Sequence, residues 1–367
     1  MRDAPGMRDA PVAEEMSGRK AQHLDVCLDA NRYHVETGSS RLNQVHLVHR
    51  ALPECDLSEV NTEIPFLGTT VKLPFFISSM TGGSAEGYRT NKDLAEVAAE
   101  LGIPVGMGSI RILTRKPEVI GDFQLKRFAP NVPVFANIGG VQLPNTQHQD
   151  IYRLMEQLAV DGIAVHLNPA QELFQPGGDT DFFGVLEATE RFIAASPVPV
   201  IIKETGMGIN PAEVRELLKR GAAAVDVAGA GGTNWVRVES YRLDDTAVAE
   251  EAGEFDNWGI PTALVLAALG RDVRNVWASG GIRSGMDIVN ALALGADAVG
   301  LALPFVRAVR AGGVAAGVEL GRRYEYVIRI AMTLTGSRTV EQLRAAPLYL
   351  DAALQADARS LAAVMGV

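Results

Sequence analysis

The sequence predicts an α/β protein folded as a (β/α)8 barrel with an N-terminal extension and C-terminal helices. From Phe75 onward, eight short apolar runs of the kind that forms buried strands recur along the chain. Segments with helical periodicity separate them. Buried strands that alternate with helices pair in parallel, and eight is the number of parallel strands that closes into a barrel.

The elements follow one another in a regular order. The expected strands span 75–80, 104–109, 134–139, 162–168, 198–204, 222–229, 276–281 and 298–303. Helical patterns between them cover 91–101, 151–160, 211–220 and 286–294. A doubly wound sheet is the alternative. It normally carries a glycine-rich dinucleotide turn after its first strand, and 80–84 lacks that spacing.

The segments around the barrel complete the expected organisation. The tandem repeat Met-Arg-Asp-Ala-Pro at the start is polar and is expected to be disordered. A helix is predicted over 14–30, extended runs around 45–48 and 69–73, and helices over 321–334 and 339–350. The four expected parts are 1–18 (repeat), 19–74 (N-terminal segment), 75–320 (barrel) and 321–367 (helices that pack on the barrel or form a subunit contact).

Composition and charge exclude several classes of function. The net charge of -10 disfavours a nucleic-acid binder, because neutralising phosphates requires basic clusters. Cys27 and Cys55 lack metal-ligand spacing, which favours a reducing compartment. No apolar run is long enough for a membrane span, and the N-terminus lacks the apolar core of a signal peptide. A cytoplasmic protein is therefore expected.

Polar or glycine-rich residues end nearly every expected strand. Active sites of this fold lie at the carboxyl ends of the strands. These ends are Ser79-Met80-Thr81, Ser109, Asn137, His166 with Asn168, Lys203 with Glu204, 231–234, 280–283 and Ala302-Leu303. Loops favour such residues for structural reasons too, but eight such ends directed at one mouth favour a functional site.

The last two strand ends predict a phosphate site. Barrels commonly bind phosphate there through backbone N–H groups and a helix N-terminus, and Arg283 could add positive charge. Together with Ser109, Asn137, Lys203 and Thr233, such a site fits flavin mononucleotide (FMN) lying across the mouth. Lys203 could offset negative charge on the flavin ring. Alternatively, this lysine pairs with Glu204 or Asp226.

The fourth strand ends in a cluster of four polar residues. Side chains alternate along a strand, so His166 and Asn168 share one face, and Gln171 and Glu172 follow Pro169 within a turn. The alternative is that these polar residues only cap the next element.

Together these motifs resemble the type 2, FMN-dependent isopentenyl-diphosphate isomerases, from about Arg19 to Leu350. The pattern His166-Leu-Asn-x-x-Gln-Glu172 is the most specific, whereas many FMN barrels share the phosphate segments. Further matching motifs are Arg19-Lys-x-x-His23, 79–83, 107–109, 136–139, 203–208, 228–235, 278–283 and 300–303. Ile110 departs from the commoner Gln, and Thr205 from the commoner Val.

The resemblance implies a TIM barrel that interconverts isopentenyl and dimethylallyl diphosphates in isoprenoid biosynthesis. It implies reduced FMN, NADPH as reductant, Mg²⁺ at Glu172, and a homo-oligomer, often a tetramer or octamer. The implied catalytic residues are His166, Gln171 and Lys203. The implied substrate-binding residues are Arg19, Lys20, His23, Ser109, Arg111, His166, Asn168 and Gln171. The implied FMN-binding residues are Ser79, Met80, Thr81, Ser109, Asn137, Lys203, Thr233, Gly281, Ile282, Arg283, Ala302 and Leu303.

Two other functions stay open at this stage. The first is another FMN barrel. A hydroxy-acid oxidase of this type needs a catalytic histidine in the region that reads Gly229-Ala-Gly-Gly-Thr-Asn234 here, and a nucleotide dehydrogenase needs a loop cysteine after the sixth strand. The second is a non-catalytic flavin-binding sensor, which would have no reason to keep the polar cluster of His166–Glu172.

Overall fold

The computed structural model describes residues 22–80, 84–243 and 245–367. The predictions for the repeat in 1–18 and for Arg19, Lys20 and Thr81 fall outside these residues. Eight parallel strands form a closed barrel in the order β10-β11-β4-β5-β6-β7-β8-β9, so neighbours in sequence are neighbours in space. The predicted TIM barrel is therefore confirmed.

Each barrel strand falls within one of the predicted apolar runs. The strands are β4 (Phe75–Ile77), β5 (Val105–Gly106), β6 (Val134–Gly139), β7 (Gly162–Leu167), β8 (Val200–Glu204), β9 (Ala224–Asp226), β10 (Val276–Ala278) and β11 (Ala298–Leu301). The register places Gly139 of β6 beside His166 of β7, and His166 beside Lys203 of β8. These three neighbouring strands therefore bring their polar ends to the same edge of the barrel.

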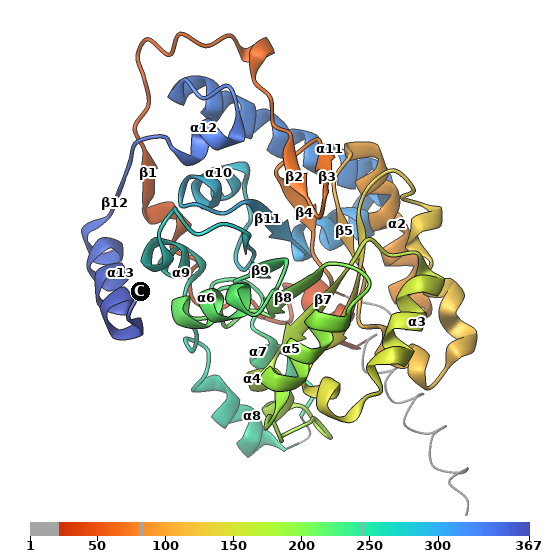
Figure 1. Ribbon diagram of the computed structural model, residues 1–367. Coiled ribbons are helices and arrows are strands. Elements are labelled where there is room, and N and C mark those ends of the chain that lie inside the picture. Colours follow the sequence, from red (N-terminus) through yellow and green to blue (C-terminus); the bar gives the residue numbers. More distant parts are fainter. Residues whose placement is uncertain (1–21, 81–83, 244) are drawn as a thin grey trace, which may run out of the picture.

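Helices surround the barrel (Figure 1). They are α2 (Ala85–Leu101), α3 (His148–Leu158), α4 (Pro169–Phe174), α5 (Val185–Ala195), α6 (Pro211–Lys219), α7 (Trp235–Ser240), α8 (Thr246–Gly253), α9 (Thr262–Leu269), α10 (Gly285–Ala293) and α11 (Leu303–Thr335). Short 3-10 helices precede or replace some of them: η3 (Ile110–Thr114), η4 (Pro117–Phe123), η5 (Leu125–Arg127) and η6 (Gly140–Asn145). Residues 22–28 are helical, within the predicted helix over 14–30.

A hairpin of β2 (Ile64–Phe66) and β3 (Thr69–Val71) closes the end of the barrel opposite the strand carboxyl ends. Phe66 stacks on Trp277 with ring centroids 4.4 Å apart and also contacts Phe76. A Cβ on Gly162, the first residue of β7, would lie 2.8 Å from the Leu67 side chain. Aromatic side chains of this hairpin thus fill the interior of the barrel at the amino ends of its strands.

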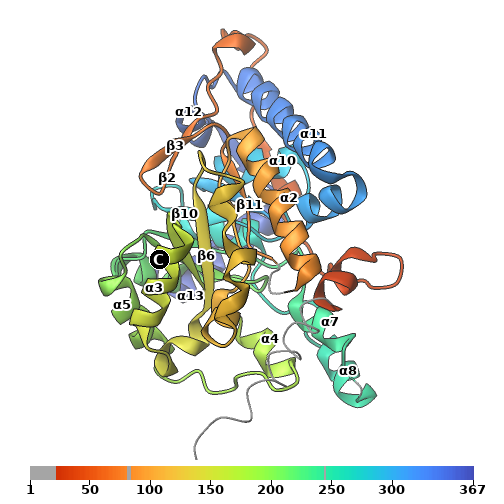
Figure 2. The same ribbon diagram turned by 90° about the vertical axis from the view of Figure 1, so that its right-hand side faces the viewer.

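Two short strands from distant parts of the sequence pair beside the barrel (Figure 1), and Figure 2 shows α11 lying along α2. The strand β1 (Val45–Leu47) pairs antiparallel with β12 (Leu348–Leu350). Helices α12 (Val340–Arg344) and α13 (Ala352–Met365) flank β12, and the 3-10 helices η1 (Leu42–Gln44) and η2 (Leu57–Glu59) lie in the N-terminal segment. The helix predicted over 339–350 is therefore only partly correct. Pro347 lacks the backbone N–H that a continuing helix needs, and its carbonyl accepts from the Val48 N–H instead.

The longest helix, α11, runs across residue 320, where the sequence placed the end of the barrel. Its helical dihedral angles are interrupted at Gly312 and Gly313, so two helices follow one another through a break. In the part of the chain that the structure describes, no helix is long and apolar enough to span a membrane.

Candidate active site

The carboxyl ends of the barrel strands surround an open pocket with about 1490 Å³ of space, part of which is open to solvent. Apart from Arg19, Lys20 and Thr81, every residue that the sequence assigned to a site lines this pocket. They are His23, Ser79, Met80, Ser109, Arg111, Asn137, His166, Asn168, Gln171, Glu172, Lys203, Thr233, Gly281, Ile282, Arg283, Ala302 and Leu303. Residues 22–28 thus reach the mouth from the N-terminal segment.

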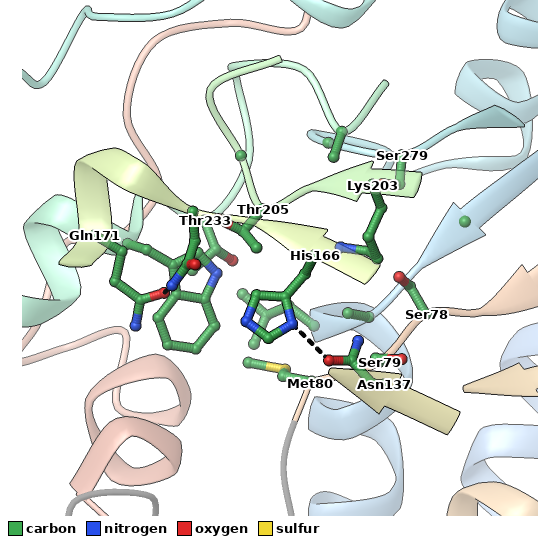
Figure 3. A pocket seen from close by; sticks show the side chains of 18 of the residues that line it. Ser78, Ser79, Met80, Asn137, His166, Gln171, Lys203, Thr205, Thr233 and Ser279 are labelled. Atoms are coloured by element: carbon green, nitrogen blue, oxygen red, sulfur yellow. Dashed lines mark hydrogen bonds between the residues drawn. The ribbon is translucent and has the colours of Figure 1, made fainter. Parts of the chain in front are cut away.

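His166 is oriented by a neighbour on the next strand. Its Nδ1 lies 2.6 Å from Oδ1 of Asn137, which is buried at the end of β6 (Figure 3). An amide oxygen can only accept, so Nδ1 carries the proton and donates. In the neutral imidazole, Nε2 is then the acceptor.

A second network joins the amides and the carboxylate that follow β7. Nδ2 of Asn168 donates to Oε1 of Gln171 and to Oε1 of Glu172, each at 3.1 Å. Oε2 of Glu172 accepts from Nε2 of Gln175 at 3.2 Å and from the backbone N–H of Asp179 at 3.0 Å. Glu172 is 6% exposed, so these donors hold a nearly buried carboxylate in one orientation.

Glu239, which sequence reasoning missed, completes this network from α7. It is fully buried, and its carboxylate contacts Nε2 of His23 at 2.8 Å and accepts from Nε2 of Gln171 at 2.9 Å and from Arg242. Burial alone would raise its pKa, but the hydrogen bonds and charges of these partners hold the pKa below its ordinary value. The sequence could have indicated Glu239 as a site residue, because it lies one helical turn beyond Trp235, the last residue of the motif 228–235.

Lys203 has structural partners as well as a place in the pocket. Its Nζ donates to the backbone carbonyl of Glu204 at 2.6 Å. Burial raises the pKa of Asp226, while the charge of Lys203 and the hydrogen bonds from Ser279 oppose that rise. The carboxylate of Glu204 instead accepts backbone N–H groups of 206–208, and burial raises its pKa. Lys203 thus hydrogen-bonds to the backbone of Glu204, and its positive charge lowers the pKa values of both Glu204 and Asp226 against the effect of burial.

The loops after β9 and β10 pack backbone against backbone. Gly280 and Gly281 have positive φ angles, and a Cβ on Gly280 would lie 2.0 Å from the carbonyl oxygen of Gly229. Only glycine fits this approach. Arg283 is held by Glu36 of the N-terminal segment, with Nε 2.5 Å from Oε1. Its charge is therefore already partly neutralised.

One buried polar atom in the pocket wall points to a ligand. Oγ of Ser79 is buried and has no hydrogen-bond partner among the described residues. Native proteins rarely leave such a group unpaired. With the glycine loops and Lys203, this hydroxyl fits a flavin nucleotide, which would supply the missing acceptor or donor.

The pocket residues offer few protein ligands for a metal ion. Among the described residues, no three His, Cys, Asp or Glu side chains are grouped so that they could hold a metal ion. Of the described residues that line the pocket, Glu172 is the one carboxylate, and Mg²⁺ is commonly bound through one or two carboxylates plus substrate phosphates. The residues therefore fit a metal that arrives with its substrate.

Fold and pocket define an FMN-dependent (β/α)8 barrel. A family model for FMN-dependent dehydrogenases matches residues 14–122 and 185–350. Among solved structures, a flavocytochrome b2 variant with pyruvate bound has a TM-score of 0.65 at 19% identity, covering 94% of this chain and 86% of that chain. A mandelate oxidase variant has a TM-score of 0.63 at 20% identity, covering 92% and 99%. At these identities the likeness concerns the fold alone.

Relatives with similar sequences identify the family within this class of FMN-dependent barrels. An isopentenyl-diphosphate delta-isomerase of Borrelia garinii subsp. bavariensis is 41% identical over 339 residues, covering 92% of this chain and 94% of the relative. Proteins of that name from Pyrococcus abyssi and a Nostoc species are 39% and 36% identical, covering 92% and 90% of this chain and 94% and 95% of the relatives. The chain belongs to the isopentenyl-diphosphate delta-isomerase family.

Proposed function

We propose that this chain is an isomerase that interconverts isopentenyl diphosphate and dimethylallyl diphosphate, as a step of isoprenoid biosynthesis. The observation that carries the proposal is the network of Asn168, Gln171 and Glu172 at the mouth of a flavin-type pocket. Many FMN barrels have the pocket. This network adds two amides and a carboxylate beside it, which suits a magnesium-bound diphosphate with an alkene.

The reaction moves a double bond by adding a proton to one carbon and removing one from another. Carbon is hard to protonate, so a positioned acid and base are required. Reduced FMN, when bound, would supply a ring that handles this proton without net electron transfer, and NADPH would keep it reduced. The FMN would be held by Ser79, Met80, Ser109, Asn137, Lys203, Thr233, the loop 281–283, Ala302 and Leu303.

The side chains at and just after the end of β7, the fourth barrel strand, orient the alkene. Because Asn137 fixes the Nδ1 proton of His166, the other ring nitrogen has a defined role as acceptor. Gln171 is fixed at both ends of its amide, by Asn168 and by Glu239. Such pre-orientation places the reacting carbons without further loss of conformational freedom.

Glu172 would bind Mg²⁺ through Oε1. In the described contacts Oε1 accepts from Asn168, whereas Oε2 accepts from both Gln175 and Asp179. A carboxylate oxygen has two lone pairs, so Oε1 retains one for a metal. The diphosphate would complete the coordination shell, held by His23, Ser109 and Arg111 together with Arg19 and Lys20.

The decisive experiment supplies isopentenyl diphosphate with FMN, Mg²⁺ and dithionite or NADPH, and follows dimethylallyl diphosphate by proton NMR. We expect conversion only with reduced flavin and a divalent cation. Conversion under air without any reductant would contradict the proposal, as would purified protein with no flavin absorption band and no FMN binding.

The same assay separates the other functions. A hydroxy-acid oxidase would reduce its flavin with a 2-hydroxy acid, but 229–234 contains no histidine. A nucleotide dehydrogenase would need a cysteine after β9, and the chain has only Cys27 and Cys55. A sensor would bind FMN without turning over the diphosphate. A cytoplasmic location and a tetramer or octamer stay predictions.

A further inference from the structure

Asp179 connects three residues that line the pocket, although it was assigned no role. Its Oδ2 accepts from Arg111 and from Nε2 of Gln142, each at 3.2 Å. Its backbone N–H donates to Oε2 of Glu172 at 3.0 Å. Arg111 lies on η3, Gln142 on η6 and Glu172 on α4, so a single residue joins three separate elements at one wall of the pocket.

The backbone around Asp179 allows little freedom. A Cβ on Gly178 would lie 2.1 Å from the carbonyl oxygen of Glu172 and 3.0 Å from that of Gln175. The loop after α4 therefore packs directly against the end of that helix. A Cβ on Gly139 would likewise lie 2.1 Å from Oε1 of Gln142, so the strand end receives that amide closely. The approach at Gly178 requires glycine because it is to backbone atoms, whereas at Gly139 the neighbour is the end of a flexible side chain.

The chemistry of the cluster suits a magnesium diphosphate. Arg111 contacts Asp179 through one terminal nitrogen, and a guanidinium has five N–H donors, so the other donors can bind a phosphate oxygen while the contact with Asp179 is kept. The carboxylate thus holds the Arg111 side chain at the same wall as Glu172 both before and after binding. Holding a binding group in place beforehand reduces the conformational entropy lost on binding.

We propose that Asp179 is a positioning residue of the diphosphate subsite. Its carboxylate holds Arg111 and Gln142, and its backbone N–H holds Glu172, so that the metal–diphosphate meets both charged partners in place. This inference rests on the proposed function, because it takes the occupant of the subsite from there.

The test measures binding without turnover. FMN-loaded protein is titrated with inorganic pyrophosphate and Mn²⁺, and free Mn²⁺ is followed by electron paramagnetic resonance. Asp179→Asn keeps the size of the side chain and removes its charge. We expect its pyrophosphate affinity to fall about 10-fold, the effect of weakening one charge-assisted hydrogen bond.

Asp181→Asn is the matched control, since it removes the same charge two residues away. Asp181 accepts from the backbone N–H of Phe183 and does not line the pocket. We expect this variant to bind pyrophosphate like the wild type. Equal FMN affinity and melting temperature in both variants would exclude a general loss of structure.

A double-mutant cycle shows whether Asp179 acts through Arg111. If it does, the losses in Asp179→Asn and Arg111→Lys should be clearly less than additive in the double variant. Additive losses, unchanged affinity in Asp179→Asn, or tighter binding would overturn the inference; the last would make Asp179 a competitor of the diphosphate. Failure of the proposed function is separate, because it appears as absent isomerisation by the wild type.

Discussion

Gln171 donates its side-chain N–H to Oε1 of Glu239 at 2.9 Å, and the same carboxylate lies 2.8 Å from Nε2 of His23. One buried negative charge thus links the end of β7, the fourth barrel strand, to the N-terminal segment that reaches the mouth of the pocket. The orientation of the Gln171 amide and the position of His23 therefore depend on each other.

Glu239→Gln should separate these two residues. A neutral amide at position 239 can donate as well as accept, so it no longer fixes which end of the Gln171 amide faces the pocket. Misplacing a substrate-orienting group can cost about 100-fold in rate, and we expect kcat to fall by roughly that factor while FMN affinity stays unchanged. Glu250→Gln, at an exposed position of α8, is the control. Wild-type kcat in Glu239→Gln would show that this linkage is dispensable.

The stability provided by the Glu239 charge should depend on pH. The folded-state pKa lies below the ordinary value of a glutamate. The contribution is therefore present above that ordinary value and is lost as the pH falls through the lowered pKa. Urea unfolding of wild type and Glu239→Gln should show a larger difference in unfolding free energy at pH 7 than near pH 3. A difference that grows on acidification would contradict this prediction.

Glu172→Gln should abolish magnesium-dependent turnover while FMN stays bound. The amide keeps an acceptor for Asn168 but loses the charge that a divalent cation needs. Activity against Mg²⁺ concentration and the flavin absorption band give the two readouts. Full activity in this variant would remove Glu172 from the metal site.

Ser79→Ala should weaken FMN binding without destabilising the flavin-free protein. The buried Ser79 hydroxyl has no partner among the described residues, so its removal costs no hydrogen bond there. A lost hydrogen bond to the ligand is worth about 1 kcal/mol, and we expect FMN affinity to fall about 5-fold. Flavin fluorescence titration and thermal unfolding measure the two effects. Unchanged affinity would show that the hydroxyl does not face the cofactor.

The two cysteines should differ sharply in reactivity. Burial raises the pKa of Cys27 to about 12, so almost none of it is thiolate at pH 8, whereas Cys55 is partly exposed. Iodoacetamide should therefore modify only Cys55 in the native protein and both after unfolding, as read by peptide mass spectrometry. Rapid native labelling of Cys27 would show that the segment around 22–28 opens readily.

The barrel and the pocket lining were predictable from local pattern. Eight apolar runs imply the strands, and the fold itself brings their carboxyl ends together, so Asn137, His166 and Lys203 needed no further information to be placed side by side. Partners chosen by tertiary packing were not predictable. Glu239 lies 68 residues from Gln171, and Asp179 lies 68 residues from Arg111. No periodicity links such distant positions.

Secondary structure outside the barrel shows the same division. The strand β12 is defined by an edge that β1 offers, and the hairpin β2–β3 by the aromatic core that it covers. The extended run predicted around 69–73 contains β3, but β2 and β12 were not predicted, because short strands are stabilised mainly by what they pair with and pack on. For this reason the helix predicted over 339–350 runs too far, because α12 ends at Arg344 and a strand follows Pro347.

The pairing of β1 with β12 also has a consequence for how the chain is made. During synthesis, Val45–Leu47 leaves the ribosome long before Leu348–Leu350 exists. The backbone N–H groups of Arg50 and Asn61 donate to the carbonyls of Leu334 and Arg338, so these hydrogen bonds also form only late in synthesis. The N-terminal segment is therefore fastened at β1 only when translation is almost complete, whereas its contacts at the mouth, His23 with Glu239 and Glu36 with Arg283, involve partners that are made earlier.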